Sequence, residues 1–189
     1  MLAASADRDP ARLAERLTTR LRDVVTLAAG RALDSRVPWH GREERLRTVL
    51  AVALGELLVH GLDLARATAT AWEIEPVDAR LVLGNLGDLL PLLVDPVAAG
   101  RLTATIEVRL RGSGPAEPPI VLAFSDGRLA VGPGPAARAD VRISAEPVAF
   151  LLISYGRLGQ WRPILTGRVL AWGRRPWIAL RLTRYLVDP

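Results

Sequence analysis

The sequence predicts an α+β protein with a helical domain over residues 1–100 and an α+β domain over residues 101–189. Apolar residues in the first half recur three and four positions apart, as in amphipathic helices. After residue 100 they alternate with polar residues at a period of two, which is typical of half-buried strands, and turns rich in glycine and proline separate the alternating segments. Helices followed by a run of strands favour the α+β class.

Composition narrows the class of protein. Half of the 189 residues are hydrophobic, which supports a packed core and argues against disorder. The absence of cysteine excludes disulfides and cysteine nucleophiles within the chain. No uncharged run approaches about 18 residues and no signal core is visible, so we expect a cytoplasmic protein with no membrane partner. The net charge is +5, but the arginines are spread among acids, and we therefore expect no nucleic-acid partner.

Three helices are expected in the first half. Asp9 and Pro10 form an N-cap signal for an amphipathic helix. A connector over residues 31–41 precedes a second helix over residues 42–67, which is apolar on nearly all sides and is therefore expected at the centre of the domain. A third helix is expected over residues 77–93.

For residues 101–189 the sequence predicts five short, mostly antiparallel strands, together with helices. Ser125-Asp126-Gly127 is a hairpin signal between two of these strands. The predicted strands cover 102–110, 120–124, 128–131, 140–144 and 168–172, with a turn over 112–119 and helices over 148–155, 160–166 and 176–186.

Three polar residues interrupt the apolar second helix. Glu56, His60 and Asp63 are spaced so that a helix presents them on one face. Burial of these groups requires a partner, and one such partner is a metal ion held by Glu56 and His60, with Asp63 as third ligand or as support for the imidazole. The alternative is that His60 is hydrogen-bonded by Glu56 or the backbone and that Asp63 pairs with an arginine such as Arg66. Spacing alone favours this alternative.

The other histidine, His40, lies in the connector. A histidine near neutrality can carry a proton. A surface or capping histidine is the favoured interpretation, because His40 directly precedes an expected helix start.

The segment GELLVHGLDLARA, residues 55–67, follows Pro38-Trp39-His40-Gly41 and an amphipathic helix, and it resembles the core helix of the mycothiol-dependent maleylpyruvate isomerase family. The resemblance implies a DinB-like metal-binding bundle in which Glu56 and His60 are ligands of a divalent metal, most often zinc. It also implies mycothiol as cofactor, a small-molecule thiol and substrate as partners, and isomerase or thiol-transferase activity. The segments ADVRISAEPVAFLLISYGR and LTGRVLAWGRRP resemble the sterol-carrier-protein-like domain often fused to that bundle.

The resemblance has one gap. The family's third metal ligand is a histidine on an earlier helix, and no such segment is present in this sequence. We therefore expect an N-terminally truncated bundle with an incomplete metal site, or a start that is internal to a longer gene product. A truncated bundle exposes an apolar helical face, which favours a homo-oligomer or a partner chain.

Two functions follow from the sequence. One is a metal- and thiol-dependent enzyme, in which Arg157, Arg168 and Arg174 are candidates to hold substrate carboxylates; ordinary surface arginines are the favoured interpretation. The alternative is a non-catalytic sterol-carrier-like module for an apolar ligand. Its candidate lining residues are also consistent with a plain core, and they are Phe124, Phe150, Leu151, Trp172 and Trp177.

Overall fold

The computed structural model describes residues 8–112 and 118–186. Its contacts divide the chain into two compact units, Met1–Arg47 and Thr48–Pro189. The domain boundary expected after residue 100 falls inside the second unit and stays a prediction. Most of the turn expected over residues 112–119 lies outside the described residues.

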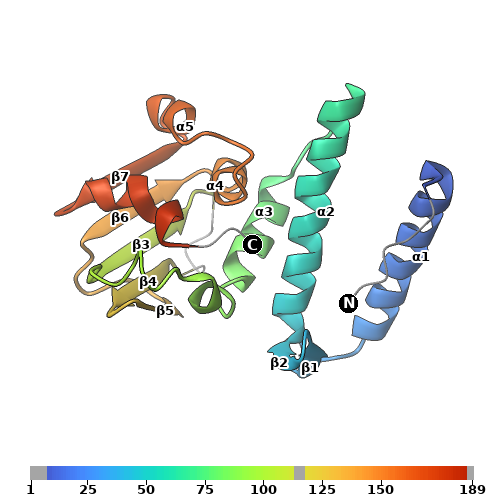
Figure 1. Ribbon diagram of the computed structural model, residues 1–189, viewed down its shortest axis with the longest axis horizontal. Coiled ribbons are helices and arrows are strands. Elements are labelled where there is room, and N and C mark those ends of the chain that lie inside the picture. Colours follow the sequence, from blue (N-terminus) through green and yellow to red (C-terminus); the bar gives the residue numbers. More distant parts are fainter. Residues whose placement is uncertain (1–7, 113–117, 187–189) are drawn as a thin grey trace. The chain divides into compact units, whose positions relative to one another are not determined.

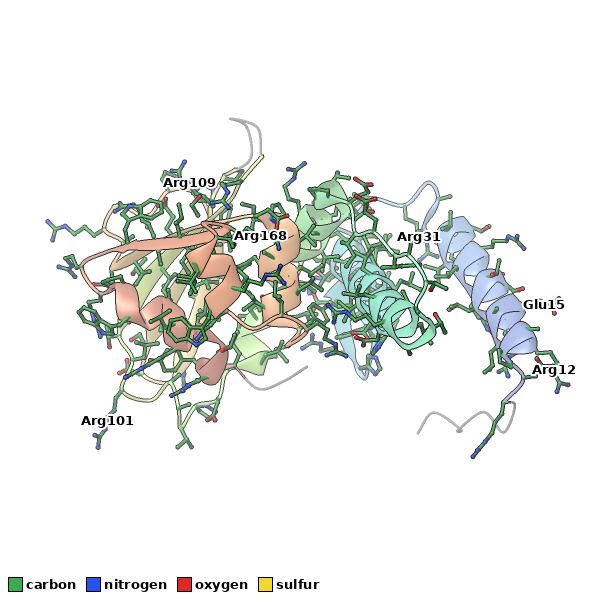
Figure 2. All side chains as sticks on the ribbon, turned by 90° about the horizontal axis from the view of Figure 1, so that it is seen from above. Arg12, Glu15, Arg31, Arg101, Arg109 and Arg168 are labelled. Atoms are coloured by element: carbon green, nitrogen blue, oxygen red, sulfur yellow. The ribbon has the colours of Figure 1, made fainter. Side chains whose placement is uncertain are left out.

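The first unit contains one long helix and a small hairpin. Helix α1 (Pro10–Ala28) begins where the sequence predicts it, because the Asp9 carboxylate accepts a hydrogen bond of 3.0 Å from the Ala11 amide. None of its residues is buried. Its Arg12 and Glu15 side chains point away from the helix into solvent (Figure 2). The exposed side chains of α1 include the apolar residues Leu17, Val25 and Leu27. Helix α1 is therefore amphipathic, and the rest of its unit does not cover its apolar side.

The predicted start of the second helix at Arg42 is wrong. Strand β1 (Arg36–Trp39) pairs with strand β2 (Arg42–Arg45) in a two-stranded antiparallel sheet. His40 and Gly41 connect the strands with φ angles of 47° and 78°. A two-residue turn with positive φ at both positions is a type I′ turn, the geometry that closes a hairpin. The helix can begin only after the second strand.

The second unit has an α+β fold with a five-stranded sheet, as predicted. The helix predicted over residues 77–93 divides into α3 and a separate 3₁₀ turn. The elements are α2 (Leu46–Thr68), α3 (Pro76–Asn85), η1 (Leu90–Leu93), β3 (Ala104–Leu110), β4 (Ile120–Ser125), β5 (Arg128–Pro133), β6 (Val141–Ala145), α4 (Pro147–Ser154), α5 (Trp161–Leu165), β7 (Val169–Gly173) and η2 (Pro176–Tyr185).

The sheet has the strand order β5-β4-β3-β6-β7 (Figure 1). Every neighbouring pair is antiparallel except β3 and β6, which are parallel. Residues 134–140 form the crossover that carries the chain from β5 to β6. Asp126 and Gly127 both have positive φ in the turn between β4 and β5, as their sequence predicts.

One face of the sheet, the inner face, is apolar and lies against α4 and η2. Ile106 and Val141 face each other across β3 and β6, and both are 0% exposed. Phe124 of β4 contacts the ring of Tyr185 in η2, with ring centroids 5.9 Å apart. The buried residues of this core are Ala99, Leu102, Ala104, Ile106, Val108, Leu122, Phe124, Leu129, Val141, Ile143, Ala145, Ala149, Val169, Ile178 and Leu182.

A second core joins α2, α3 and α4. Leu58 of α2, Val82 of α3 and Leu151 of α4 are among its buried residues. Helix α4 therefore contributes to both cores, and half of its eight residues are buried. A short helix without charged residues suits this position because it meets apolar neighbours on two sides.

The expected central position of α2 is wrong. Its buried residues Ala51, Leu58 and Ala65 lie on one side, whereas Leu64 is 68% exposed. The length and hydropathy of α2 also meet the criteria for a membrane span. That is weak evidence, because core helices of globular proteins meet the same criteria.

Candidate functional site

The three polar residues of α2 do lie together on one face, as the spacing predicts. His60 lies between the two carboxylates: its Nε2 atom is 3.0 Å from Glu56 Oε2, and its Nδ1 atom is 3.5 Å from Asp63 Oδ2. The side chains are 60%, 50% and 37% exposed for His60, Glu56 and Asp63. Water can therefore hydrate much of these three side chains, and their presence on α2 does not require a metal ion.

Arg157, just after α4, completes this cluster. Its Nη2 atom donates a hydrogen bond of 2.9 Å to Asp63 Oδ2, and its Nη1 atom donates to the carbonyl oxygen of Tyr155 at 2.7 Å. The hydrogen bond from Arg157 lowers the pKa of Asp63, against the opposing effect of desolvation. The arginine expected as partner, Arg66, instead donates to the Arg157 carbonyl oxygen at 3.4 Å. The cluster links α2 to α4.

Two glycine and aromatic pairs fix α2 against its neighbours. A Cβ at Gly55 would lie 2.5 Å from the Tyr155 hydroxyl, and one at Gly61 would overlap the ring of Trp72. The Trp72 indole donates to the Leu58 carbonyl oxygen at 3.1 Å. Burial, reinforced by the charge of Glu56, raises the pKa of Tyr155. Small residues at these two positions let the aromatic side chains approach the helix backbone.

The residues of α2 fit half of a metal site. A gap of 3.0 Å between Glu56 Oε2 and His60 Nε2 allows both atoms to bind one ion at the usual zinc distances of about 2.0–2.2 Å. Asp63 contacts the opposite nitrogen of the ring. A catalytic zinc needs three protein ligands, and within residues 8–112 and 118–186 no group of three His, Cys, Asp or Glu is placed to hold a metal ion.

The five predicted apolar-ligand residues do not converge. Phe124 and Phe150 belong to the core on the inner face of the sheet. Leu151 belongs to the second core, between α2, α3 and α4. Trp172 and Trp177 are 46% and 53% exposed, and Trp172 lies on the opposite, outer face of the sheet. Only Phe124 and Phe150 share one apolar region.

The outer face contains a buried carboxylate that the sequence did not single out. Glu107 of β3 is 2% exposed because the crossover lies over it. Its Oε2 atom accepts a hydrogen bond of 2.9 Å from the Ala136 amide, and its Oε1 atom is 3.0 Å from Arg109 Nε. Desolvation raises its pKa, but the Arg109 and Ala136 hydrogen bonds and the charge of Arg142 outweigh this, and the net pKa is lowered. Its fully paired surroundings indicate a structural role.

The other two candidate arginines are also paired within the chain. Arg168 Nη2 is 2.6 Å from Glu146 Oε2, and Arg174 Nη2 is 2.6 Å from Asp140 Oδ1. Glu146 also caps α4 by accepting from the amides of residues 148 and 149. These contacts overcome desolvation and lower the pKa of Glu146, and the Arg174 hydrogen bond lowers the pKa of Asp140. Both pairs fix loops beside the sheet.

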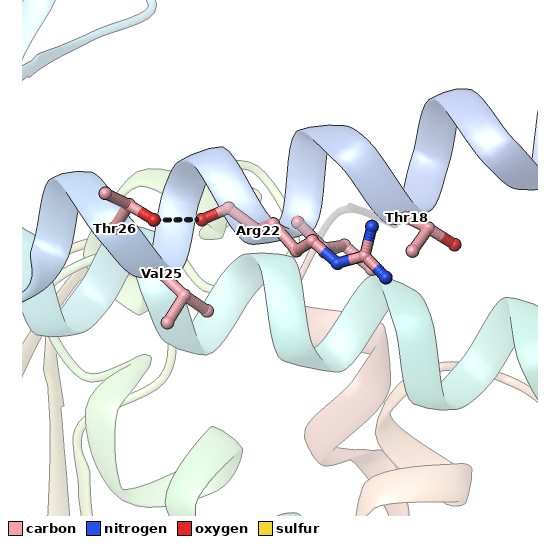
Figure 3. A pocket seen from close by; sticks show the side chains of 5 residues that line it. Thr18, Arg22, Val25 and Thr26 are labelled. Atoms are coloured by element: carbon pink, nitrogen blue, oxygen red, sulfur yellow. Dashed lines mark hydrogen bonds between the residues drawn. The ribbon is translucent and has the colours of Figure 1, made fainter.

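Two further features carry no evident chemistry. His40 is exposed in the hairpin turn, with its ring 4.6 Å from that of Trp39, which agrees with an ordinary surface histidine. A shallow groove runs along α1 (Figure 3). Its lining comes from one helix, and Thr26 of that lining donates its hydroxyl to the Arg22 carbonyl oxygen at 2.8 Å. The lining residues are Thr18, Leu21, Arg22, Val25 and Thr26.

Several solved structures are similar to this chain. They include the sec-alkylsulfatase Pisa1 from Pseudomonas sp., with 20% identity and a TM-score of 0.49 over 56% of this chain and 16% of that one. The UbiJ-SCP2 ubiquinone synthesis protein has 21% identity and a TM-score of 0.41 over 55% of this chain and 96% of that one. Sterol carrier protein 2 like 2 from Aedes aegypti has 19% identity and a TM-score of 0.40 over 49% and 82%.

No curated protein sequence matches the chain. The resemblance to the maleylpyruvate isomerase family and its DinB-like bundle finds no support in these comparisons and stays a prediction. The model of the SCP-2 sterol transfer family matches residues 83–173, just under half of the chain. This range begins near the end of α3, ends with β7 and includes the whole five-stranded sheet. Residues 83–173 are thus similar to this family, which agrees with the resemblance of the second half of the sequence to a sterol-carrier-protein-like domain.

Proposed function

We propose that the second unit is a binding module for a small apolar ligand and that it does not need a metal for this role. The observation that carries the proposal is the match of residues 83–173 to the SCP-2 sterol transfer family. The apolar inner face of the sheet, with α4 and η2 against it, supports the proposal because a ligand of this class needs an apolar surface removed from water.

The ligand position that fits best is between the inner face and α4. Phe150, on the side of α4 that faces the sheet, is only partly buried, as are Ile153 and Leu158 nearby in the chain. Partly buried side chains at the margin of a core can change rotamer at lower cost than fully enclosed ones. Phe124 contributes to this region from strand β4, on the inner face of the sheet. Leu151, Trp172 and Trp177 are not part of it.

Titration with a fatty acid that carries an environment-sensitive fluorophore tests this position. We expect saturable binding by the wild-type chain. Phe150→Trp should weaken it roughly tenfold, because a bulkier ring fills the region the ligand would enter. Val148→Leu is the matched control, since Val148 is on the same helix but packs against the second core. No saturable binding, or equal weakening by both variants, would contradict the proposal.

We also propose, as a second candidate, that Glu56 and His60 are a metal half-site of an enzyme related to the maleylpyruvate isomerases. The 3.0 Å gap between their side chains favours it. With two ligands we expect weak, reversible zinc binding that dialysis removes and that His60→Ala abolishes. The check is equilibrium dialysis followed by elemental analysis. Zinc retained at one equivalent would require a further ligand, and binding unaffected by His60→Ala would reject the half-site.

A further inference from the structure

Residues 147–187 are basic and contain no acid. No aspartate or glutamate occurs between Glu146 and Asp188. Over the same stretch the sequence has Arg157, Arg162, Arg168, Arg174, Arg175, Arg181 and Arg184. The net charge of this segment is therefore strongly positive, in contrast to the mixed charges along the rest of the chain.

The same stretch exposes large apolar side chains. Trp161 and Leu165 of α5 are 61% and 84% exposed, Leu170 and Trp172 of β7 are 48% and 46% exposed, and Trp177 of η2 is 53% exposed. Strand β7 is an outermost strand of the sheet, and it contacts both α5 and η2. Figure 1 shows α5 and β7 along one side of the sheet. Leu170 and Trp172 project from the outer face of the sheet at this strand, whereas η2, which carries Trp177, packs on the inner face. We call residues 161–177, which border the sheet on both sides of β7, the β7 edge.

The arginines of the β7 edge keep this surface positive. Among the described residues, no ion pair is found for Arg162, whereas Arg175 donates to the Thr103 carbonyl oxygen and its charge acts on the Asp140 carboxylate. Arg174 pairs with Asp140, but the arginine side chain is 77% exposed and the carboxylate only 12%. The Arg174 guanidinium therefore reaches solvent, while the Asp140 carboxylate is largely covered.

We propose that the β7 edge binds the surface of an anionic phospholipid membrane. Tryptophan is favoured at such an interface, because its ring is apolar and its indole N–H can still reach water or a headgroup. The arginines add attraction to anionic headgroups, and leucine side chains contribute apolar area to the acyl boundary. This goes beyond ligand binding, and it differs from the expectation that the chain has no membrane partner.

Two other occupants fit these observations less well. A second copy of the chain, related by a two-fold axis, would place the basic edge against itself with no acids to neutralise it. A single-stranded nucleic acid would use tryptophans for stacking, but Leu165 and Leu170 offer no flat surface for a base. An anionic membrane, in contrast, would interact favourably with the aromatic, the aliphatic and the basic residues of the β7 edge.

The test is binding of the full chain to vesicles without any added apolar ligand, so that its outcome is separate from that of the proposed ligand binding. Vesicles of phosphatidylcholine are compared with vesicles that contain about one-third phosphatidylglycerol, a composition that supplies the negative surface potential. Co-sedimentation and tryptophan emission report binding. We expect binding only to the anionic vesicles, with a blue shift of the emission and weakening at high salt.

Variants locate the contact. Trp161→Gln with Leu165→Gln should weaken binding roughly tenfold, since both side chains lose apolar contact. The matched control, Leu92→Gln with Val97→Gln, changes two residues that are 57% and 89% exposed and lie outside the β7 edge. Arg162→Gln should weaken binding about fivefold. Its control is Arg128→Gln on β5, the opposite outermost strand.

Any of the following outcomes would overturn the proposal. The first is no binding to anionic vesicles. The second is equal weakening by the control variants, which would show that general charge or hydrophobicity causes the binding. The third is tighter binding to a single-stranded oligonucleotide, or self-association that buries the tryptophans, in place of vesicle binding.

Discussion

The two faces of the sheet bury residues of the same strand for different physical reasons. On the inner face, Ile106 is 0% exposed among apolar neighbours. On the outer face, the next residue, Glu107, is 2% exposed beneath the crossover. The inner face is held by apolar burial, which is non-directional, whereas the outer face depends on particular hydrogen bonds at Glu107. The difference shows that a period of two identifies which residues share a face but not which face is covered.

Pairing explains how a carboxylate is tolerated on the outer face. Both oxygens of Glu107 are engaged, one by the Ala136 amide and one by Arg109. Arg142 adds its charge, with Nε 3.9 Å from Oε1. A buried carboxylate costs free energy unless it is paired in this way. The same contacts fix the crossover that allows β6 to lie parallel to β3.

The largest effect is expected on the inner face. Ile106→Ala should lower the free energy of unfolding by about 4 kcal/mol, because it removes buried methyl and methylene groups and leaves a cavity in a rigid core. Urea unfolding followed by circular dichroism measures this. A loss below about 1 kcal/mol would mean that the inner face is not the main core.

The β7 end of the sheet is expected to tolerate no side chain at Gly173. This residue has φ of 130°, and an added Cβ would lie 2.5 Å from the Asp140 carbonyl oxygen. Gly173→Ala should therefore cost about 3 kcal/mol from backbone strain and steric overlap. Gly132→Ala is the control, because nothing lies within 4 Å of a Cβ at Gly132. Equal unfolding midpoints for the two variants would contradict the close approach.

The outer face is tested by Glu107→Gln. The amide keeps the size of the side chain but places an NH₂ group or an uncharged oxygen against Arg109, and we expect a loss of about 2 kcal/mol at neutral pH. Because the folded-state pKa of Glu107 is lowered, its contribution is present above the unfolded-state pKa and is lost as pH falls through the folded-state pKa.

The difference in stability between wild type and Glu107→Gln should therefore shrink below about pH 4. Urea unfolding at several pH values checks this. A difference that stays constant down to pH 3 would show that the charge of Glu107 is not what stabilises the outer face.

The smallest effect is expected at the exposed arginine of the outer face. Arg142 has a 39% exposed side chain and lies 3.9 Å from Glu107. Arg142→Gln should cost less than about 1 kcal/mol, because solvent screens such a pair. Thermal unfolding at low and high salt measures it, and a loss as large as that of Glu107→Gln would show that Arg142, not Arg109, is the main partner of the carboxylate.

Local signals predicted most of the elements. The Asp9 cap, the Asp126-Gly127 turn and the period of two after residue 100 depend on residues that are close in the chain, and the structure confirms them. The hairpin at His40 and Gly41 was missed because a histidine adopts positive φ less readily than asparagine or glycine, so its sequence does not signal a turn of that type.

In the candidate site, too, contacts between residues close in the sequence were predictable, and contacts between distant residues were not. Helical spacing places Glu56, His60 and Asp63 on one face of α2, and the structure shows them in contact. The partner of Asp63, Arg157, is 94 residues away in the sequence. No local pattern specifies a contact over that distance, because the packing of α2 beside α4 brings the two residues together.

The sequence by itself determined the α+β class, the five strands and the polar face of α2, since these depend on periodicity and local backbone preference. Only the tertiary structure decided that α4 and not α2 contributes to both cores, that Glu107 is buried, and that Phe124 and Phe150 share an apolar region from which Trp172 is absent. Burial is a property of what covers a residue. The segments that cover Glu107 and Phe124, the crossover and the C-terminal 3₁₀ helix η2, are far from these two residues in the sequence.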